Sequence, residues 1–428
     1  MSTNFRCAFC APTKIIFMIN RKFVFILPFL LVIACSKSKN TNSVKDVQQT
    51  EALVQTDTID NTPPRDNKEG NNRKKGAKGY YDIPYDKKAR SIKVGDLFKN
   101  IRYVRLETKN ESLLNDNIDK IESKNGIIYI KDSKLSGPEV ILFDHKGKHL
   151  RNIDRCGEGP EEYINGVNIA INDKGHVSFA DRTDKGRIVT YNSEGKFLSR
   201  INLSEIDLKD LTYLNDSILL LRSEHGWQTK HEFQSINMHT KEVKNMNLVK
   251  YRPYRMWFAE GFTSYQGKVL IAGYQSNNIL EATEDTVKVK YTLNIGNKMP
   301  PSDFWEKQPS YEVTKREEKS NEFIGHVPFF AENNQYMLIS FMGSLGQDNL
   351  QSLALVEKST GKSKTFKRIL LAENVMIEPV QFYWQSNGEI IIPVWPEKII
   401  ESSNKDFLTQ FPSLKEDDNP ILLFGELK

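Results

Sequence analysis

The sequence predicts an all-β fold, a six-bladed β-propeller that is closed by pairing of its N- and C-terminal strands. A unit of four short strands, separated by turn signals, recurs six times at spacings of roughly 40 to 70 residues, the period range of propeller blades. The sixth unit has fewer recognisable strands than the others, whereas the β-rich segment Asn100–Thr108 has no unit of its own. Pairing the two would close a ring and remove the exposed sheet edges that promote aggregation.

The first two units show the repeat most clearly. The segment NGIIYIKD ends at Asp132 and leads to VILFDHKGKHLRNI, while KGHVSFAD ends at Asp181 and leads to RIVTYNSEGKFLSRI. Gly126 precedes Asp132 by six residues, and Gly175 precedes Asp181 by the same spacing. Each unit therefore reads as a strand, a tight turn with Asn, Asp or Gly, an apolar strand, a longer loop and a hairpin.

Four weaker copies follow along the chain. They begin with the segments YLNDSILLLRS, SYQGKVLIAGY, ENNQYMLISFM and QSNGEIIIPVW, and the last one ends in the apolar run ILLF at residues 421–424. A pair of β-sandwiches could use the same strands, and a right-handed β-helix also repeats, but with a shorter period and without alternating hairpins. The propeller, spanning residues 80–428, accounts for both the hairpins and the spacing.

Residues 1–35 form a targeting signal outside the predicted domain. Arg21 and Lys22 precede the uncharged run FVFILPFLLVIA, which ends directly before Cys35. A helix of this length rises about 18 Å, short of the roughly 30 Å hydrocarbon core, so a membrane-spanning helix is not expected. A compact signal also begins at Met18, so translation could start there rather than at the first methionine.

The end of this signal, LVIAC, resembles a bacterial lipobox. In that motif, small or apolar residues precede a cysteine that is lipidated and becomes the new N-terminus. We therefore expect Cys35 to be acylated and to hold the protein on a lipid bilayer.

Residues 36–79 are rich in Lys, Asn, Thr, Asp and Gln and almost lack aromatic residues, so they are too polar to bury a core. They are predicted to form a disordered tether with a reach of roughly 35 to 40 Å. The formal net charge of +5 is too small for the chain length to indicate nucleic-acid binding, and the basic cluster at 73–78 lies within the tether. We expect a monomer.

The segment RCGEGPEEY, residues 155–163, contains two glycines and a proline between the first two units. A phosphate-binding loop would need a helix N-terminus after it, to direct free N–H groups at the anion. Here a proline and then a strand follow, so the segment is interpreted as the crossover between two blades. The glycines permit positive φ there, and Pro160 stiffens the turn.

The lipobox, the tether, the turn Gly-x-Gly-Pro-x-Glu-Tyr and the following segment FAD…RIVTYNSEGKFL together resemble the 6-bladed β-propeller lipoproteins of Bacteroides-like bacteria. The resemblance covers nearly all of the mature chain and implies the fold and a location in the cell envelope. It implies no reaction. In related lipoproteins an acidic cluster after the lipidated cysteine marks export to the cell surface. Here residues 36–40 are basic, so we expect the periplasmic side of the outer membrane.

Candidate binding residues lie on the loops between units. In a four-stranded blade the first and third turns lie on one face, and these turns are mostly tight in this sequence. The loops of the opposite face are longer and carry aromatic rings and arginines, which suit sugars, peptides or carboxylates. The candidates are Arg155, Arg182, Trp227, Tyr254, Arg255, Trp257 and Trp305.

Two classes of function fit these observations. The first is a membrane-anchored binding or assembly module for a peptide, glycan or protein partner, with no cofactor. The alternative is a metal-assisted hydrolase or lyase acting on a lactone, glycan or peptide, which would use Ca²⁺ or Zn²⁺. Asp132 and Asp181 stand at matching positions and are the candidate metal ligands, although such residues more often cap a strand end. No metal-binding spacing or hydrolase motif favours an enzyme, so the binding module is preferred.

Overall fold

β-Strands dominate the computed structural model, as the sequence predicts. The structure describes residues 78–86, 89–115, 118–134, 137–182, 186–203, 206, 208–223, 231–246, 261–272, 277–299, 324–343, 351–378, 384–386, 388–402 and 405–428. The helices in these ranges are short: α1 (Val94–Leu97), α3 (Pro396–Ile400), α4 (Lys405–Leu408) and the 3-10 turn η1 (Gly296–Lys298). The prediction of an all-β fold is confirmed.

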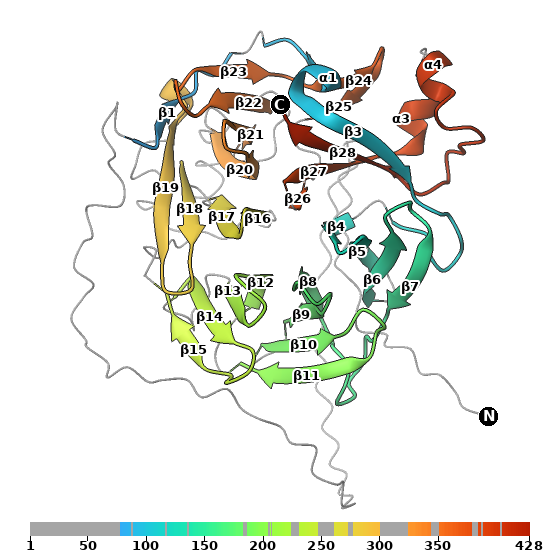
Figure 1. Ribbon diagram of the computed structural model, residues 1–428, viewed down its shortest axis with the longest axis vertical. Helices are drawn as coiled ribbons and strands as arrows, with labels where there is room; N and C mark the ends of the chain where they lie inside the picture. The colour runs from blue at the N-terminus through green and yellow to red at the C-terminus, as the bar shows by residue number, and fades with distance from the viewer. Residues whose placement is uncertain are drawn as a thin grey trace, which may run out of the picture.

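Most described strands belong to six sheets of four or five strands that lie around a common centre (Figure 1). The first sheet contains β4 (Ile118–Lys124), β5 (Ile127–Lys134), β6 (Gly137–Asp144) and β7 (His149–Ile153). The second contains β8 (Gly166–Ile171), β9 (Val177–Asp181), β10 (Arg187–Tyr191) and β11 (Phe197–Asn202). The third contains β12 (Leu208–Tyr213), β13 (Ile218–Ser223), β14 (Phe233–Asn237) and β15 (Val243–Asn245).

The remaining three of these sheets lie around the same centre in Figure 1. The fourth contains β16 (Phe262–Tyr265), β17 (Lys268–Ala272), β18 (Asn278–Ala282), β19 (Val287–Asn294) and β1 (Tyr80–Asp82). The fifth contains β20 (Ile324–Glu332), β21 (Tyr336–Gly343), β22 (Ser352–Glu357) and β23 (Ser363–Phe366). The sixth contains β26 (Trp384–Ser386), β27 (Glu389–Val394), β28 (Ile421–Leu427) and β3 (Phe98–Arg105). In every sheet the first strand named lies innermost.

The hydrophobic core is divided among the spaces between neighbouring sheets. One cluster joins Tyr129 and Leu142 of the first sheet to Ile169 and Phe179 of the second. Five further clusters of described residues occupy the other interfaces, including the one between the sixth sheet and the first. Because each sheet is covered on both faces, its middle strands are mostly buried, and all five residues of β9 are buried.

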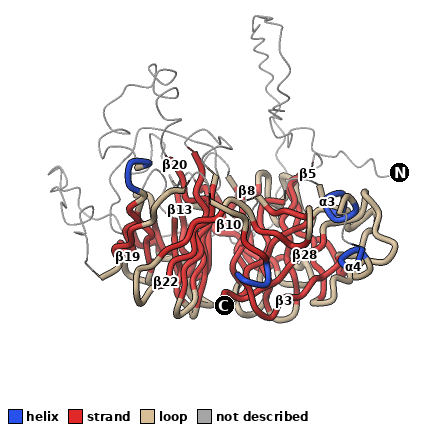
Figure 2. Tube along the Cα trace, turned by 90° about the horizontal axis from the view of Figure 1, so that it is seen from above, coloured by secondary structure: helices blue, strands red, loops and turns tan. Residues whose placement is uncertain are grey.

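Two strands from opposite ends of the chain meet in the sixth sheet. The C-terminal strand β28 pairs antiparallel with β27 on one side and with β3 on the other, where Val104 lies opposite Leu422. Between β27 and β28 the chain forms α3 and α4, which lie at the rim of the molecule near β28 (Figure 2). These two helices were not predicted.

The segment before β3 runs along the outside of the ring. β1 pairs in parallel with β19, and β2 (Ile92–Lys93) pairs in parallel with β24 (Ile369–Ala372). A small third strand, β25 (Val375–Ile377), completes that sheet, which the sequence did not predict. This outer segment, residues 80–86 and 89–93, thus contacts the fourth sheet and the small three-stranded sheet before the chain enters the sixth.

The face that carries the first and third turns of each sheet, here called the tight-turn face, is linked from sheet to sheet by hydrogen bonds. The opposite side is called the long-loop face. The bonds join Asn125 Nδ2 to Asp173 O (2.6 Å), Asp173 N to Asp216 Oδ1 (2.9 Å), Asn215 Nδ2 to Glu284 Oε1 (2.5 Å), Tyr265 OH to Asn334 Oδ1 (3.4 Å), Asn333 Nδ2 to Leu427 O (3.0 Å) and Ser386 Oγ to Ser123 O (2.7 Å). Each bond crosses an interface between two sheets.

Candidate functional site

A cavity with a volume of about 320 Å³ lies among the innermost strands β4, β8, β12, β16 and β26. Its lining extends into the turns that follow these strands, such as Asn172–Asp173 and Gln266–Gly267. The axial cavity, as we call it, therefore lies at the tight-turn end of the ring axis. Five sheets contribute to it, and no single repeat contains the site.

Four aromatic side chains from three of these strands line the axial cavity, and each ring is half-buried. They are Tyr213, Phe262, Tyr265 and Trp384. The Tyr213 hydroxyl lies 2.7 Å from Ser178 Oγ, and burial raises the pKa of Tyr213 to about 12. This hydroxyl therefore stays neutral under physiological conditions.

Two lysines on β4 cover the inner edge of the neighbouring strand β8. Lys120 Nζ donates to Ile169 O at 2.6 Å, and Lys124 Nζ donates to Ile171 O at 3.2 Å. An innermost strand has unpaired carbonyl groups on its axial side, and a buried carbonyl without a partner is costly. The lysines therefore satisfy part of the backbone that faces the axis.

Each of these lysines also has a carboxylate partner in the cavity lining. Lys120 Nζ lies 2.9 Å from Glu122 Oε1, and Lys124 Nζ lies 2.5 Å from Asp173 Oδ1. Burial would lower the pKa of Lys120, but the carboxylates of Glu122 and Asp210 outweigh it and raise the pKa above its usual value. Lys120 is therefore protonated, and the four charged residues that line the cavity sum to zero.

The cavity residues were not among the predicted site residues. On β4, the charged residues Lys120, Glu122 and Lys124 alternate with Ile121 and Ser123. Such alternation indicates a strand with one polar face, but in a propeller that face can be axial or external. The signal was present, whereas the assignment to the axis requires the assembled ring.

The two candidate metal ligands, Asp132 and Asp181, lie at equivalent strand ends on the long-loop face, and both are fully buried. Asp181 Oδ1 accepts the N–H groups of Ile164 (3.2 Å) and Asn165 (2.7 Å). Its Oδ2 accepts a hydrogen bond from Arg187 Nε at 2.7 Å. Both oxygens of Asp181 are thus held by the protein, and in the described part of the chain no group of three or more His, Cys, Asp or Glu residues is placed to hold a metal ion.

Asp132 has fewer partners than Asp181. Its Oδ2 accepts the N–H of Asn115 at 3.1 Å, while its Oδ1 is buried without a hydrogen-bond partner. Across the strand pair it faces Glu139, where Asp181 faces Arg187. Burial raises the pKa of Asp132 to about 6, and the Glu139 carboxylate adds to this effect.

Of the predicted binding residues, the structure describes Arg155 and Arg182. Arg155 is exposed beside the turn between β7 and β8, and Arg182 follows β9, where its N–H donates to Asn165 O at 2.8 Å. Both are on the long-loop face, as predicted. The other candidates, and the lipidation site, lie outside the described residues: Cys35, Trp227, Tyr254, Arg255, Trp257 and Trp305.

The glycine-rich turn beside Arg155 connects β7 to β8 as the predicted crossover, but neither Gly157 nor Gly159 has the expected positive φ. A Cβ at Gly157 would instead lie 2.0 Å from Glu162 Oε2, so the turn needs glycine for this close approach. Glu162 Oε2 accepts the Gly159 N–H at 2.8 Å, and Tyr163 is fully buried. The Tyr163 hydroxyl donates to Pro138 O at 2.6 Å, and its ring stacks on Phe179 with centroids 4.2 Å apart. Tyr163 therefore anchors the turn in the core between the first two sheets.

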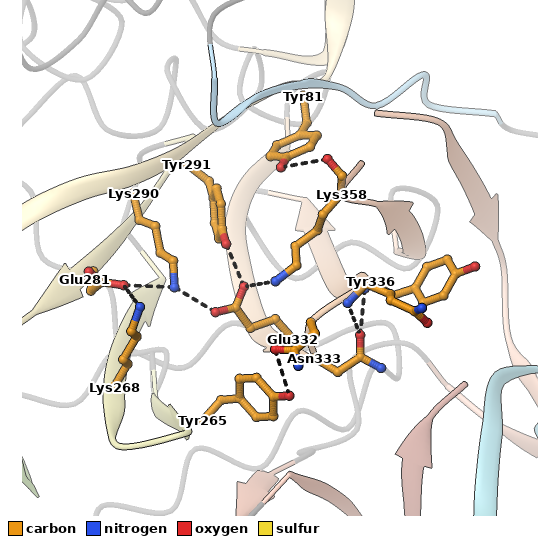
Figure 3. A network of polar contacts seen from close by, with 12 residues as sticks. Tyr81, Tyr265, Lys268, Glu281, Lys290, Tyr291, Glu332, Asn333, Tyr336 and Lys358 are labelled. Atoms are coloured by element: carbon orange, nitrogen blue, oxygen red, sulfur yellow. Dashed lines mark hydrogen bonds and ion pairs between the residues drawn. The ribbon is translucent and has the colours of Figure 1, made fainter. Parts of the chain in front are cut away.

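A second polar cluster surrounds Glu332 at the end of β20 (Figure 3). Lys290 Nζ (2.7 Å) contacts Oε1, while Tyr291 OH (2.7 Å) and Lys358 Nζ (3.0 Å) contact Oε2. Burial opposes ionisation of Glu332, but these three contacts outweigh it and lower its pKa. Tyr81 of β1 donates to Lys358 O at 3.4 Å, so the cluster also holds the outer segment. Both oxygens of Glu332 are thus held by protein donors, which indicates a structural role.

The sequence family described as "Domain of unknown function (DUF4934)" matches residues 81–426. No curated protein matches the chain significantly. None of the helices in the described ranges is long and apolar enough to span a membrane.

Among solved structures, the chain is similar to a Bacteroides fragilis protein whose name describes it as exported, with a TM-score of 0.63 and 16% identity over 82% of this chain and 100% of that one. This similarity concerns the fold. A member of the duf4221 family from Bacteroides vulgatus gives a TM-score of 0.48 at 12% identity, covering 78% of this chain and 97% of that one. BamB from Moraxella catarrhalis gives a TM-score of 0.39 at 8% identity, covering 77% of this chain and 100% of that one.

Proposed function

The chain belongs to the DUF4934 family, and on that premise we propose that it is a β-propeller binding module of the bacterial cell envelope that holds a small ligand in its axial cavity. The observation that carries this proposal is the cavity itself. It combines half-buried rings with polar side chains from five sheets, and concave sites of mixed character are the usual place for small ligands.

The propeller that we propose has six blades and is closed by β3. Three observations support it. Six sheets surround a common centre, six hydrophobic clusters fill the interfaces between neighbours, and the hydrogen bonds of the tight-turn face include one from Ser386 of the sixth sheet to Ser123 of the first. The β28–β3 ladder joins the chain ends within one sheet, as a closed propeller requires.

The proposed location is the outer membrane, with Cys35 acylated and the propeller on the periplasmic side. The lipobox LVIAC and the polar tether at 36–79 support it. Cys35→Ala should release the protein from the membrane fraction, because the acyl chains would be the anchor. Retention of this variant together with an unmodified mature N-terminus by mass spectrometry would contradict lipidation. Digestion of the wild-type chain by protease added to intact cells would place it on the surface instead.

The long-loop face stays a second candidate surface. Arg155 and Arg182 lie there, while Tyr254, Arg255 and Trp257 belong to the same prediction. Arginine forks and aromatic rings suit a larger partner, such as a peptide or protein. A partner on that face and a ligand in the axial cavity are compatible, because the two lie on opposite sides of the ring.

The binding function is tested by blocking the cavity. Ser264 lines it and is exposed, so Ser264→Trp places a large ring in the ligand space without replacing a core residue. Lys364→Trp, at an exposed position on the outer strand β23, is the matched control. After incubation of the full chain with a small-molecule extract of the cell envelope, native mass spectrometry should detect a ligand on the wild type and the control, and none on Ser264→Trp. Equal mass spectra for all three proteins would refute cavity binding.

A further inference from the structure

We infer that the ligand of the axial cavity is a neutral mono- or disaccharide, an inference that rests on the binding function proposed above. Three features of the cavity support it: its internal charge balance, its aromatic rings and its supply of hydroxyl and amide groups. Each restricts the chemistry of the ligand in a different way.

The charge balance favours an uncharged ligand. The cavity carries Lys120, Glu122, Lys124 and Asp173, and each lysine already has a carboxylate within 2.9 Å and a backbone carbonyl within 3.2 Å. A charged ligand that enters such a site must lose water without gaining an unpaired counter-charge, which is unfavourable. An anion or a cation is therefore a poor occupant, whereas a neutral polar molecule meets no such cost.

The aromatic rings favour a ligand with flat apolar faces. Phe262 and Tyr265 lie on β16, Tyr213 lies on β12 and Trp384 on β26, so rings reach the cavity from three sheets. Aromatic side chains provide large apolar planes at little conformational cost, and those with a polar group also offer a hydrogen bond. A pyranose has C–H groups on its ring faces and hydroxyls around its edge, which matches planes next to polar groups.

Hydroxyl and amide side chains complete the match. The lining includes Asn172, Thr212, Ser264 and Gln266. Hydroxyl and amide groups can both donate and accept hydrogen bonds, as sugar hydroxyls do, while lysine only donates and an ionised carboxylate only accepts. The volume of about 320 Å³ is near the lower limit for ligand pockets, which restricts the occupant to one or two sugar rings.

The experiment measures binding of defined probes to the full chain by isothermal titration calorimetry. The first panel contains neutral saccharides: glucose, galactose, mannose, N-acetylglucosamine, maltose, cellobiose and lactose. The second contains charged molecules of similar size, namely glucuronate, glycyl-glutamate and glycyl-lysine. Wild type, Lys364→Trp, Ser264→Trp and Tyr265→Leu are compared, the last because it removes one ring plane while keeping an apolar side chain.

We expect at least one neutral saccharide to bind wild type and Lys364→Trp equally and to lose measurable binding to Ser264→Trp. The loss of a ring contact in Tyr265→Leu should weaken the binding of that saccharide about tenfold. Its affinity should be the same at low and high salt, since screening acts only on charged ligands.

Two results overturn the inference, and they differ in what they mean for the proposed function. If only charged probes bind, with salt-dependent affinity that Ser264→Trp removes, the cavity is a binding site but not for neutral saccharides. If no saccharide binds in a manner that Ser264→Trp blocks, the saccharide assignment is wrong. The extract experiment then decides separately whether the cavity binds anything.

Discussion

Asp132 and Asp181 occupy the same place in successive sheets, yet their hydrogen-bond partners differ. Asp181 faces Arg187 across the strand pair and has both oxygens bound. Asp132 faces Glu139 and has one buried oxygen without a partner. A buried carboxylate without a compensating donor is costly, so ionisation of Asp132 destabilises the fold, whereas the carboxylate of Asp181 has donors for both oxygens.

The raised pKa of Asp132, about 6, predicts a pH-dependent effect of Asp132→Asn. The folded wild type binds this proton more tightly than the unfolded chain, so the contribution of Asp132 to stability is highest below pH 4 and is lost as the pH rises towards 6. The amide variant keeps an acceptor for Asn115 and never ionises. We expect the free energy of unfolding of this variant to exceed that of wild type by up to about 3 kcal/mol at pH 7 and by little at pH 4. Urea unfolding at both pH values measures the difference.

Asp181→Asn is the control at the equivalent position. This change removes a buried carboxylate from Arg187, whose side chain is largely buried. Breaking a buried ion pair typically destabilises a protein by roughly 3 to 5 kcal/mol, because one charge is left unpaired. We expect Asp181→Asn to lower the free energy of unfolding and Asp132→Asn to raise it. A decrease of similar size in both variants at pH 7 would contradict this expectation.

At the scale of single elements, the hairpin turn between β6 and β7 shows how the first sheet is fitted to the sixth. Gly147 has φ of +86°, and a Cβ there would lie 2.1 Å from the backbone oxygen of Arg105 in β3. The carbonyl of Gly147 accepts the Glu107 N–H at 2.8 Å. The glycine is therefore required twice, for its backbone conformation and for close approach to a neighbouring strand.

Gly147→Ala should destabilise the fold more than Gly361→Ala. Gly361 occupies the corresponding turn of the fifth sheet with φ of +71°, but a Cβ there would have no neighbour within 4 Å. Gly361→Ala should destabilise the fold by about 1 to 2 kcal/mol, because alanine is disfavoured in the left-handed conformation. Gly147→Ala should have the same cost and, in addition, the cost of a clash with β3. Chemical unfolding of both variants measures the difference. Equal losses would mean that the contact between the turn and β3 is not tight.

These turns also show how much of the fold could be predicted from the sequence. Asp144 and Gly147, like Asn192 and Gly195, form turns closed by local hydrogen bonds, so their pattern is visible in a few consecutive letters. The strands and hairpins of the first two sheets follow the same local logic. The helices α3 and α4 were missed because they insert between the second and third strands of one sheet, where the repeat predicts a longer loop but no helix.

The candidate site was less predictable than the fold. Long loops with arginines and rings were visible in the sequence, and Arg155 and Arg182 do lie on the long-loop face. The axial cavity is formed by side chains from five sheets, among them Lys124 and Trp384, which are far apart in the chain. Their proximity depends on ring geometry, and no local pattern encodes it.

At the scale of the whole molecule, the sixth sheet depends on both ends of the chain. Removing residues 421–428 would delete β28, which lies between β27 and β3. It would also expose the core residues that pack against Leu423 and Phe424 in the folded protein. We expect the truncated protein to lose cooperative thermal unfolding and to be cut rapidly by protease. A chain lacking only the exposed Lys428 is the control and should behave as wild type. A truncated protein with a sharp transition near that of wild type would show that the last strand is dispensable.

The pairing of β28 with β3 also sets the order of events when the protein is made. A ribosome synthesises β3 well before β28, so β3 has no partner on this edge until the strands of the other sheets have been made. Contacts between distant residues form slowly, because a large loop has to close first. Every nascent or prematurely terminated chain therefore presents an unpaired β3 edge, to which chaperones and proteases have access. Pairing with β28 therefore protects the β3 edge, and only a chain that includes β28 can cover it.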